Sequence, residues 1–265
     1  MNASSSRPLA IVTGGSSGIG FELAREFAEN GFNLVVNASG ERIADAAREL
    51  EATGATVEAV QADLATPTGV DDLYGRIAGR PVAAAALNAG VGAGGAFATG
   101  TELEDELRLI DLNVRSTVHL AKLLVRDMVA RDEGRILFVS SIASTMPGSF
   151  QAVYNASKSF VQSFAMALRD ELKDTQVTVT SLMPGPTDTE FFERADMLDT
   201  KVGASDKDDP ADVARKGFEA LMAGKERVVA ASLSTKLQGR GSRLLPDSAK
   251  AAMHRRMAEP GSGRS

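Results

Sequence analysis

A glycine-rich turn near the N-terminus most constrains what this chain can fold into. An uninterrupted apolar run at residues 9–12 leads into TGGSSGIG at residues 13–20, after which apolar residues recur at helical spacing. A continuous apolar run predicts a strand buried on both faces, so the order is strand, turn, helix. In that order Gly14 permits a tight turn, Gly18 lets backbone approach a pyrophosphate, and Gly20 allows close helix–strand packing. The turn therefore predicts a dinucleotide site, with the helix N-terminus facing the phosphates.

Strand-like and helix-like segments alternate along the rest of the chain. Further strands are predicted at residues 33–37, 56–64, 82–87, 135–139, 177–182 and 227–231. Helices are predicted at 41–52, 66–78 and 102–131 (interrupted near 111–114). Another holds Tyr154 and Lys158 and runs to about residue 173, and one begins at Pro210 with Asp209 as its cap. This alternation predicts the α/β class, as a doubly wound parallel sheet of the Rossmann type. No repeat or linker divides the chain, so we expect a single domain.

Composition excludes several classes of function. The chain has no cysteine and only two histidines among its 265 residues, which excludes thiolate catalysis and argues against a metal site. A net charge of −6 argues against nucleic acid as the main partner. No window offers about 18 uninterrupted apolar residues, so no membrane span is expected. The N-terminus has no secretory apolar region, and we expect a cytoplasmic protein.

Tyr154 and Lys158 form a candidate acid–base pair. They stand four residues apart at the start of a long helical pattern, so they share one helix face. A phenol has a pKa of about 10, and lowering it to about 7 needs ~4 kcal/mol. One positive charge ~4 Å away at an effective dielectric of ~20 supplies about that much. The pair therefore predicts a tuned proton donor, beside Ser141 at the end of the preceding strand.

Each of these residues also has an ordinary structural interpretation. A Tyr-x-x-x-Lys pair on a helix is commonly a solvated face, and Ser141 could serve only as a helix cap. Asn113 interrupts a helical pattern, where asparagine competes for backbone hydrogen bonds, and this misfit hints at a role.

The tip of the second predicted strand bears on cofactor identity. It reads Asn37-Ala38-Ser39-Gly40, with no carboxylate before Glu41 to hold a ribose 2′-hydroxyl. A 2′-phosphate would meet no repulsion there and could gain hydrogen bonds from Ser39 and Arg42. This favours NADP(H) over NAD(H), although Arg42 could equally be a solvated residue of the first helical turn.

Together these motifs resemble the short-chain dehydrogenase/reductase family in its single-domain form. The resemblance covers about residues 8–231 and rests on six motifs in the family's order: TGGSSGIG at 13–20, Asn88-Ala89-Gly90, Asn113, Ser141, Tyr154-x-x-x-Lys158 and Pro184-Gly185. The sequence departs from the family twice. Leu87 stands where the family often has a further Asn, and Ser17 stands where many NADPH-preferring members carry a basic residue.

The resemblance implies a function and a set of site residues. It implies an oxidoreductase in which Tyr154 is the general acid or base. Lys158 would lower the pKa of Tyr154 and bind the nicotinamide ribose. Ser141 would hold the substrate oxygen, and Asn113 would hold a water molecule of a proton relay. Asp63 would contact the adenine, Asn88 would fix the neighbouring backbone, and Thr189 would bind the carboxamide. The expected cofactor-binding residues are Gly14, Ser16, Ser17, Gly18, Ile19, Gly20, Ser39, Arg42, Asp63, Leu64, Asn88, Ala89, Gly90, Tyr154, Lys158, Pro184, Gly185, Thr187 and Thr189.

The expected substrate is a fairly apolar ketone or aldehyde. The alternatives are a 3-oxoacyl thioester reductase of the fatty-acid-synthesis type, and a dinucleotide-binding regulatory protein without turnover. Candidate pocket or lid residues, each of which could equally be core packing, are Met146, Pro147, Phe150, Phe191, Phe192, Met197 and Leu198. By resemblance we expect a homodimer or homotetramer, which apolar positions at Leu107, Ile110, Val114, Val118 and Leu124 would permit.

We expect two regions of different character. Residues 1–231 would form the NADP-binding catalytic domain, with a lid near 186–209, because this long connection has few strand signals. Residues 232–265 would form a basic C-terminal extension, which carries Lys236, Arg240 and Arg243. It would be partly helical, with Asp247 or Ser248 as the cap, and disordered at 261–265. A subunit contact or a solvated end is expected for it rather than a nucleic-acid contact.

Overall fold

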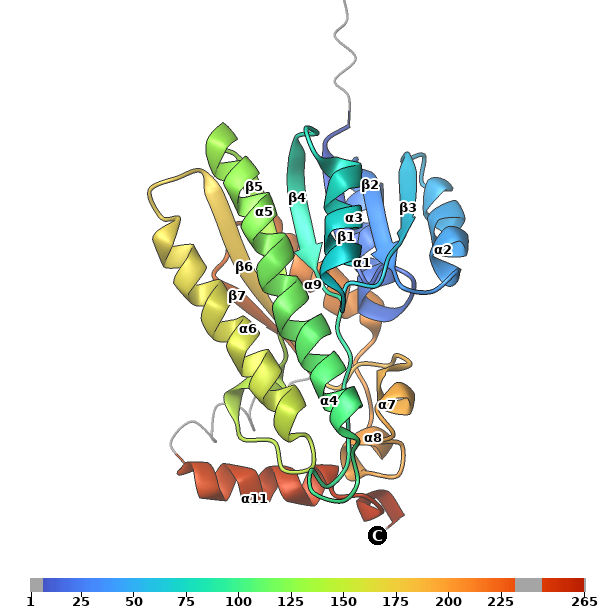
Figure 1. Ribbon diagram of the computed structural model, residues 1–265, viewed down its shortest axis with the longest axis vertical. Coiled ribbons are helices and arrows are strands. Elements are labelled where there is room, and N and C mark those ends of the chain that lie inside the picture. The colour runs from blue at the N-terminus through green and yellow to red at the C-terminus, as the bar shows by residue number, and fades with distance from the viewer. Residues whose placement is uncertain (1–6, 232–244, 265) are drawn as a thin grey trace, which may run out of the picture.

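The centre of the molecule is a parallel β-sheet. The computed structural model describes residues 7–231 and 245–264, so Lys236, Arg240 and Arg243 lie outside the described residues. All seven predicted strands are present, in the order β3-β2-β1-β4-β5-β6-β7 (Figure 1). The strands are β1 (Leu9–Thr13), β2 (Asn33–Ala38), β3 (Val57–Gln61), β4 (Val82–Leu87), β5 (Gly134–Val139), β6 (Val177–Pro184) and β7 (Arg227–Ala230).

Helices cover both faces of the sheet. Along β1, Ala10 and Val12 face one apolar core, while Leu9 and Ile11 face the other, because successive strand residues point to opposite faces. The first core includes residues of α1 (Gly18–Glu29), α2 (Arg42–Glu51) and α9 (Pro210–Met222). The second includes residues of α3 (Pro67–Ile77), α5 (Ser116–Arg131) and α6 (Ala152–Glu171). The predicted doubly wound α/β fold is confirmed.

The strand order reverses between β1 and β4. The chain leaves β1 toward β2 on one side and returns to β4 on the other, so the connections diverge at the carboxyl ends of these two strands. A crevice at such a switch point is where doubly wound sheets bind their ligands. The fold thus places the glycine-rich turn beside the loop that follows β4.

The predicted interruption of the long helical pattern is confirmed. The segment consists of α4 (Leu103–Ile110), a π-helical turn η1 (Asp111–Arg115) and α5. π-Helical turns insert a residue into the ladder and are common at functional sites. Asn113 lies in this turn and is buried. Leu124, which the sequence placed among possible subunit-contact positions, is instead in the core, because it faces the sheet rather than solvent.

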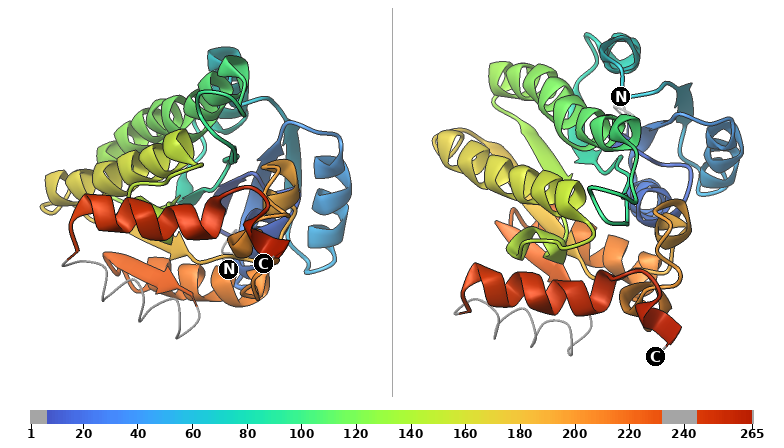
Figure 2. Two further views of the ribbon diagram at one scale, coloured as in Figure 1. Left: turned by 90° about the horizontal axis from the view of Figure 1, so that it is seen from below. Right: turned by 60° about the horizontal axis from the view of Figure 1, so that its bottom comes forward.

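The segment after β6 and the C-terminal segment pack together. Residues 186–209, called the lid segment here because a lid was expected there, contain two short helices, α7 (Phe191–Arg194) and α8 (Lys201–Ala204). Asp209 caps α9 as predicted by accepting from the Ala211 N–H at 2.8 Å. Helix α11 (Asp247–Ala258) lies across the end of the molecule where the strands finish (Figures 1 and 2). Its buried Ala258 joins an apolar cluster with Phe192 and Met197 of the lid segment.

Two expectations for the C-terminus are wrong. The cap of α11 is Pro246, whose extended backbone precedes the helix, and Asp247 is already its first helical residue. The expected disorder at 261–265 does not hold for 261–264. Gly261 and Gly263 donate their N–H groups to the side chain and backbone of Asp199, at 2.7 and 2.8 Å, and a short 3₁₀ turn η4 (Ser262–Arg264) forms. These bonds to the lid supply order that the glycine-rich composition alone could not indicate.

None of the helices in residues 7–231 and 245–264 combines the length and apolar character needed to cross a bilayer.

Candidate active site

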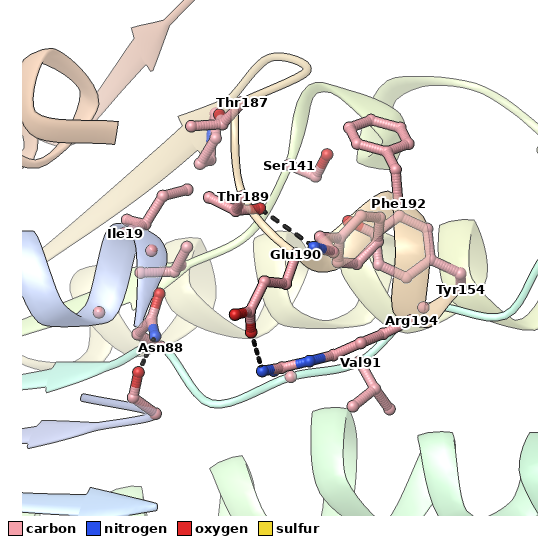
Figure 3. A pocket seen from close by; sticks show the side chains of 18 of the residues that line it. Ile19, Asn88, Val91, Ser141, Tyr154, Thr187, Thr189, Glu190, Phe192 and Arg194 are labelled. Carbon is pink, nitrogen blue, oxygen red and sulfur yellow. Dashed lines mark hydrogen bonds and ion pairs between the residues drawn. The ribbon is translucent and has the colours of Figure 1, made fainter. Parts of the chain in front are cut away.

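A large cavity lies at the switch point, between the carboxyl ends of the strands and the lid segment (Figure 3). It joins most of the predicted site residues, which come from segments far apart in the sequence. Those that line it are Gly14, Ser16, Ser17, Gly18, Ile19, Gly20, Ser39, Asp63, Leu64, Asn88, Ala89, Gly90, Ser141, Tyr154, Pro184, Gly185, Thr187 and Thr189. Three predicted residues are not part of its surface: Arg42, Asn113 and Lys158.

The glycine-rich turn forms a cradle with no room for side chains. A Cβ on Gly20 would lie 2.1 Å from the Gly14 carbonyl oxygen and 2.4 Å from Asn88 Nδ2. Gly18 has a φ of 56°, in the left-handed region that favours glycine. Helix α1 begins at Gly18 and no side chain caps it, so its first N–H groups face the cavity. These features suit close approach of an anionic group to the backbone.

Asn88 and Thr13 tie the ends of β4 and β1 together. Thr13 Oγ1 accepts from the backbone N–H groups of Asn88 and Ala89, at 2.9 and 3.0 Å. In return, Asn88 Nδ2 donates to the Thr13 carbonyl at 3.0 Å. The two strands on either side of the switch point are thus fixed to each other, which keeps the crevice open at a set width.

Ser141 caps a helix and also lines the cavity. It precedes the 3₁₀ turn η2 (Ile142–Thr145), and its Oγ accepts from the Ala143 N–H at 3.1 Å, so it is a helix cap. The same residue lines the cavity, as Tyr154 does. The role expected for Ser141 in holding the substrate oxygen stays a prediction.

Burial sets the proton affinity of Tyr154. Only 9% of this side chain is exposed, and its ring lies 5.2 Å from the Phe191 ring, centroid to centroid. Burial raises the pKa of Tyr154 to about 12, and the hydrogen bond with Ser141 lowers it by less. The role expected for Lys158, lowering the pKa of Tyr154, stays a prediction. Tyr154 is held as a protonated phenol, the form of a proton donor.

Lys158 lies behind the cavity wall. Its Nζ donates to the Val139 carbonyl at 3.0 Å and is 6.0 Å from the Tyr154 ring centroid. Burial lowers the pKa of Lys158 to about 8. In the described residues no carboxylate pairs with Nζ, and the ammonium faces the phenol, so its charge acts on Tyr154 and on whatever binds beside it.

Asn113 holds the loop that follows β4. Its Oδ1 accepts from the Val91 N–H and its Nδ2 donates to the Val91 carbonyl, both at 2.9 Å. Nδ2 also donates to Ser157 Oγ on α6, at 3.1 Å. The side chain thus fixes the cavity-lining loop to the helix of Tyr154. The water-holding role expected for Asn113 stays a prediction.

Arg42 is bound by the lid rather than turned to the cavity. Its Nη1 lies 2.7 and 3.1 Å from the two carboxylate oxygens of Glu190, the residue after Thr189. Arg194 of α7 pairs with the same carboxylate. Ser39, the other residue expected at a 2′-phosphate, lines the cavity.

Asp63 lies at the other end of the cavity, where the adenine was expected. Arg108 of α4 pairs with Asp63 Oδ2 at 3.0 Å, and the Ala65 N–H donates to Oδ1 at 3.0 Å. Asn37 closes this end of the cavity, and its Nδ2 donates to the Val60 and Ala62 carbonyls at 3.0 Å each.

The cavity wall includes both apolar and polar side chains besides Ser141 and Tyr154. Apolar ones are Ile142, Met146, Phe191, Phe192, Val202 and Met257; polar or charged ones are Thr145, Gln151, Glu190, Arg194, Ser205, Asp206, Lys207, Asp208 and His254. Of the seven candidate pocket residues, only Met146, Phe191 and Phe192 line the cavity. Phe150 and Met197 pack in the lid cluster, Leu198 is 59% exposed, and Pro147 lies off the cavity surface.

The sequence interpretation missed the contribution of α11. His254 and Met257 of this helix line the cavity, and His254 Nδ1 lies 2.9 Å from the Ser149 carbonyl oxygen. Burial lowers the pKa of His254, more than the bond to Ser149 raises it. Gln151, the residue that precedes α6, lines the cavity and was also missed.

These residues fit a nicotinamide dinucleotide. The side-chain-free cradle at Gly14–Gly20 suits a pyrophosphate, and the small residues Ala89 and Gly90 leave the loop after β4 open. A Cβ on Gly90 would lie 3.0 Å from Asn113 Oδ1 and 3.3 Å from Lys158 Nζ, so a side chain there would crowd both groups behind the cavity wall. Ser141 and Tyr154 line the same cavity as this cradle and this loop.

Comparison with known proteins identifies the family. A family model described as short chain dehydrogenase matches residues 8–197. The chain is 36% identical over 187 residues to 1-deoxy-11-beta-hydroxypentalenate dehydrogenase of Streptomyces avermitilis, covering 68% of each chain. It is 30% identical over 179 residues to the NADP-dependent 3-hydroxy acid dehydrogenase YdfG of Salmonella typhi, covering 67% of this chain and 71% of that one.

A solved structure agrees with this. A short-chain dehydrogenase from Sphingobium yanoikuyae in complex with NADPH has 26% sequence identity and a TM-score of 0.81, covering 93% of this chain and 94% of that chain. The cradle, the serine and the buried tyrosine and lysine described above occur here on the fold of that family. The chain belongs to the short-chain dehydrogenase/reductase family, whose members act on alcohol and carbonyl groups with nicotinamide cofactors.

Proposed function

We propose that this protein is an NADP(H)-dependent oxidoreductase that transfers hydride between the nicotinamide and an apolar ketone or aldehyde, or the matching alcohol. The observation that carries the proposal is that Ser141 and the buried Tyr154 both line a cavity that is also lined by the glycine cradle, with the Lys158 ammonium behind the wall. The apolar lining by Phe191, Phe192 and Met257 supports an apolar substrate.

The protein residues supply a proton and the geometry for the reaction. When bound, the cofactor supplies the hydride. In reduction, Tyr154 donates its proton to the substrate oxygen, which the Ser141 hydroxyl holds in place. The raised pKa of Tyr154 keeps the phenol protonated at neutral pH. The Lys158 ammonium then stabilises the phenolate left behind. Nζ lies 6.0 Å from the ring centroid, and a positive charge at that separation contributes about 3 kcal/mol at an effective dielectric of ~20.

The preference for NADP(H) is supported by the tip of β2. Ser39 lines the cavity, and the β2 tip carries no carboxylate, so nothing there repels a 2′-phosphate. Arg42 begins α2 directly beyond this tip and bears the nearest positive charge in that part of the sequence. The NADPH-bound relative and the NADP-dependent 3-hydroxy acid dehydrogenase are consistent with this preference.

Steady-state kinetics with both cofactors test the proposal. The purified protein should oxidise NADPH in the presence of apolar ketones or aldehydes, drawn from a panel with quinones, steroids and 3-oxoacyl thioesters. Its kcat/KM should favour NADPH over NADH, and Arg42→Gln should reduce this preference by about tenfold or more, since it removes a charge-assisted contact. Arg48→Gln on the same helix is the matched control. A wild-type preference for NADH would refute the cofactor assignment, and turnover confined to 3-oxoacyl thioesters would refute the substrate class.

We also propose that the protein forms a homodimer or homotetramer. Apolar side chains on α4 and α5 remain accessible, with Leu107 50%, Ile110 40% and Val118 36% exposed. Burial of these side chains against a second copy would remove apolar surface from water.

A further inference from the structure

A charged bridge connects the lid to helix α2 across the cofactor cleft. Arg42, the first residue of α2, donates to both carboxylate oxygens of Glu190, which lies 148 positions later in the chain. The contact joins two segments that otherwise belong to different sides of the cleft. Glu190 lines the cavity and Arg42 does not, so the carboxylate is the cavity-facing partner.

The bridge lies next to the phosphate cradle. Thr189 precedes Glu190, and its Cγ2 is 2.8 Å from the position of a Cβ on Gly18, so the lid segment touches the glycine-rich turn. Figure 3 shows Thr189 close to Ile19 and the Glu190 side chain extending from the lid toward Arg194. A carboxylate therefore stands between the start of α1 and the start of α2, the region through which the phosphates of a dinucleotide would run.

A 2′-phosphate and the Glu190 carboxylate would need the same donors. One edge of the Arg42 guanidinium can pair with only one anionic group at a time, either a carboxylate or a phosphate. The pKa of Glu190 is lowered chiefly by its hydrogen bond from Arg42, so the carboxylate is ionised at neutral pH and would also repel a nearby phosphate. Glu190 thus opposes the phosphate both by occupying Arg42 and by its own charge.

We propose that Glu190 is a specificity-determining residue for the cofactor, which competes with the 2′-phosphate for Arg42 and selectively weakens NADP(H) binding. This inference rests on the proposed NADP(H) preference. When the phosphate takes Arg42, the lid loses its tie to α2. NADP(H) binding and release of the lid are then coupled, whereas NAD(H), which has no 2′-phosphate, leaves the bridge intact.

Arg194 lowers the free-energy cost of replacing Glu190 by the 2′-phosphate as the partner of Arg42. It pairs with Glu190 from one turn further along α7, and that pair does not depend on α2. When Arg42 turns to the phosphate, Glu190 keeps Arg194 as its partner and no carboxylate is left unpaired. Because the Arg42–Glu190 pair is solvent-exposed, with exposed fractions of 62% and 39%, the expected effects are several-fold rather than many-fold.

Equilibrium binding of NADPH and NADH, followed by nucleotide fluorescence without substrate, tests the inference. Glu190→Gln should lower the Kd for NADPH by about two- to fivefold and leave that for NADH within twofold. Glu193→Gln, an exposed carboxylate on the same helix, controls for net charge and should change neither. Arg194→Gln should raise the Kd for NADPH and leave that for NADH unchanged, because Glu190 then holds Arg42 more tightly. In a Glu190→Gln background, Arg194→Gln should leave the NADPH-to-NADH ratio unchanged.

The controls separate failure of this inference from failure of the proposed function. If Arg42→Gln raises the Kd for NADPH selectively but Glu190→Gln changes both cofactors equally, or weakens NADPH, competition is refuted and the cofactor assignment stands. If Arg42→Gln leaves both Kd values unchanged, the assignment of Arg42 to the 2′-phosphate fails, and the inference fails with it. Selective tightening by Glu190→Gln that disappears in the Arg42→Gln background supports the competition.

Discussion

Replacement of Tyr154 by Phe should reduce the rate of carbonyl reduction by about 10²–10⁴-fold, the usual contribution of a positioned general acid. The substitution removes one oxygen and leaves the ring against Phe191, so the cavity keeps its shape. The Kd for NADPH, measured by fluorescence titration, should stay within a few fold of wild type, since the glycine cradle and Arg42 are untouched. Loss of rate with binding retained is the signature of a group that acts on the reaction itself.

The chain offers a matched control for this substitution. Its other tyrosine, Tyr74 on α3, donates to Asp127 Oδ2 at 2.7 Å and does not line the cavity. Tyr74→Phe should leave kcat within about twofold of wild type. If Tyr154→Phe retained most of the wild-type rate, the proton would have to come from another group, and the assignment of Tyr154 would be wrong.

Replacement of Lys158 by Met should reduce the rate of reduction by about 10²-fold while making the protein more stable. The loss of rate follows from removing a charge that stabilises the phenolate by about 3 kcal/mol, with Nζ 6.0 Å from the ring centroid. The gain in stability follows from burial, which lowers the pKa of Lys158 to about 8 in the folded chain. At pH 7 the folded state therefore holds a charge that it disfavours by about 3 kcal/mol relative to the unfolded chain.

The net gain in stability from Lys158→Met is smaller than that. The substitution leaves the Val139 carbonyl without its donor, at about 1 kcal/mol. A gain of about 1–2 kcal/mol remains, or a rise in Tm of about 2–8 °C. The exposed Lys173, 64% accessible, gives the control Lys173→Met, with little change in either rate or Tm.

The pH dependence of the stability gain from Lys158→Met shows whether the gain comes from removing the buried ammonium. Between pH 8 and about 10.5 the unfolded chain binds more protons at Lys158 than the folded chain, so wild-type stability rises with pH through this window. Below pH 8 the penalty is constant. Melting curves of Lys158→Met and wild type should thus differ most at pH 7 and converge by pH 10. A variant that is less stable than wild type at pH 7 would show that the buried ammonium stabilises the fold.

The sheet and the cradle could be predicted because local patterns specify them. Continuous apolar runs mark strands buried on both faces, and the glycine at position 20 is needed because a side chain there would overlap the Gly14 carbonyl. The irregularity at Asn113 was also visible, since asparagine disrupts a helical pattern, although its bonds to Val91 depend on a loop 22 residues away.

What could not be predicted depends on contacts between distant segments. The spacing of Tyr154 and Lys158 can be read from the sequence, but their burial, which raises the pKa of Tyr154, cannot. In the same way, nothing local to Arg42 indicates that Glu190 binds it. The polar and basic composition of the C-terminal region concealed the fact that α11 brings His254 into the cavity, because only its packing on the lid positions it there.

The central claim is that a nicotinamide bound in this cavity lies beside the hydroxyl of Tyr154. A crystal structure of the protein with NADPH tests it most directly. We predict the pyrophosphate on the backbone of Gly18–Gly20, the nicotinamide ribose within hydrogen-bond distance of Lys158, and open space for a carbonyl compound between the ring, Ser141 and Tyr154. A nicotinamide turned away from Ser141 and Tyr154, or a nucleotide bound outside the glycine cradle, would contradict the account.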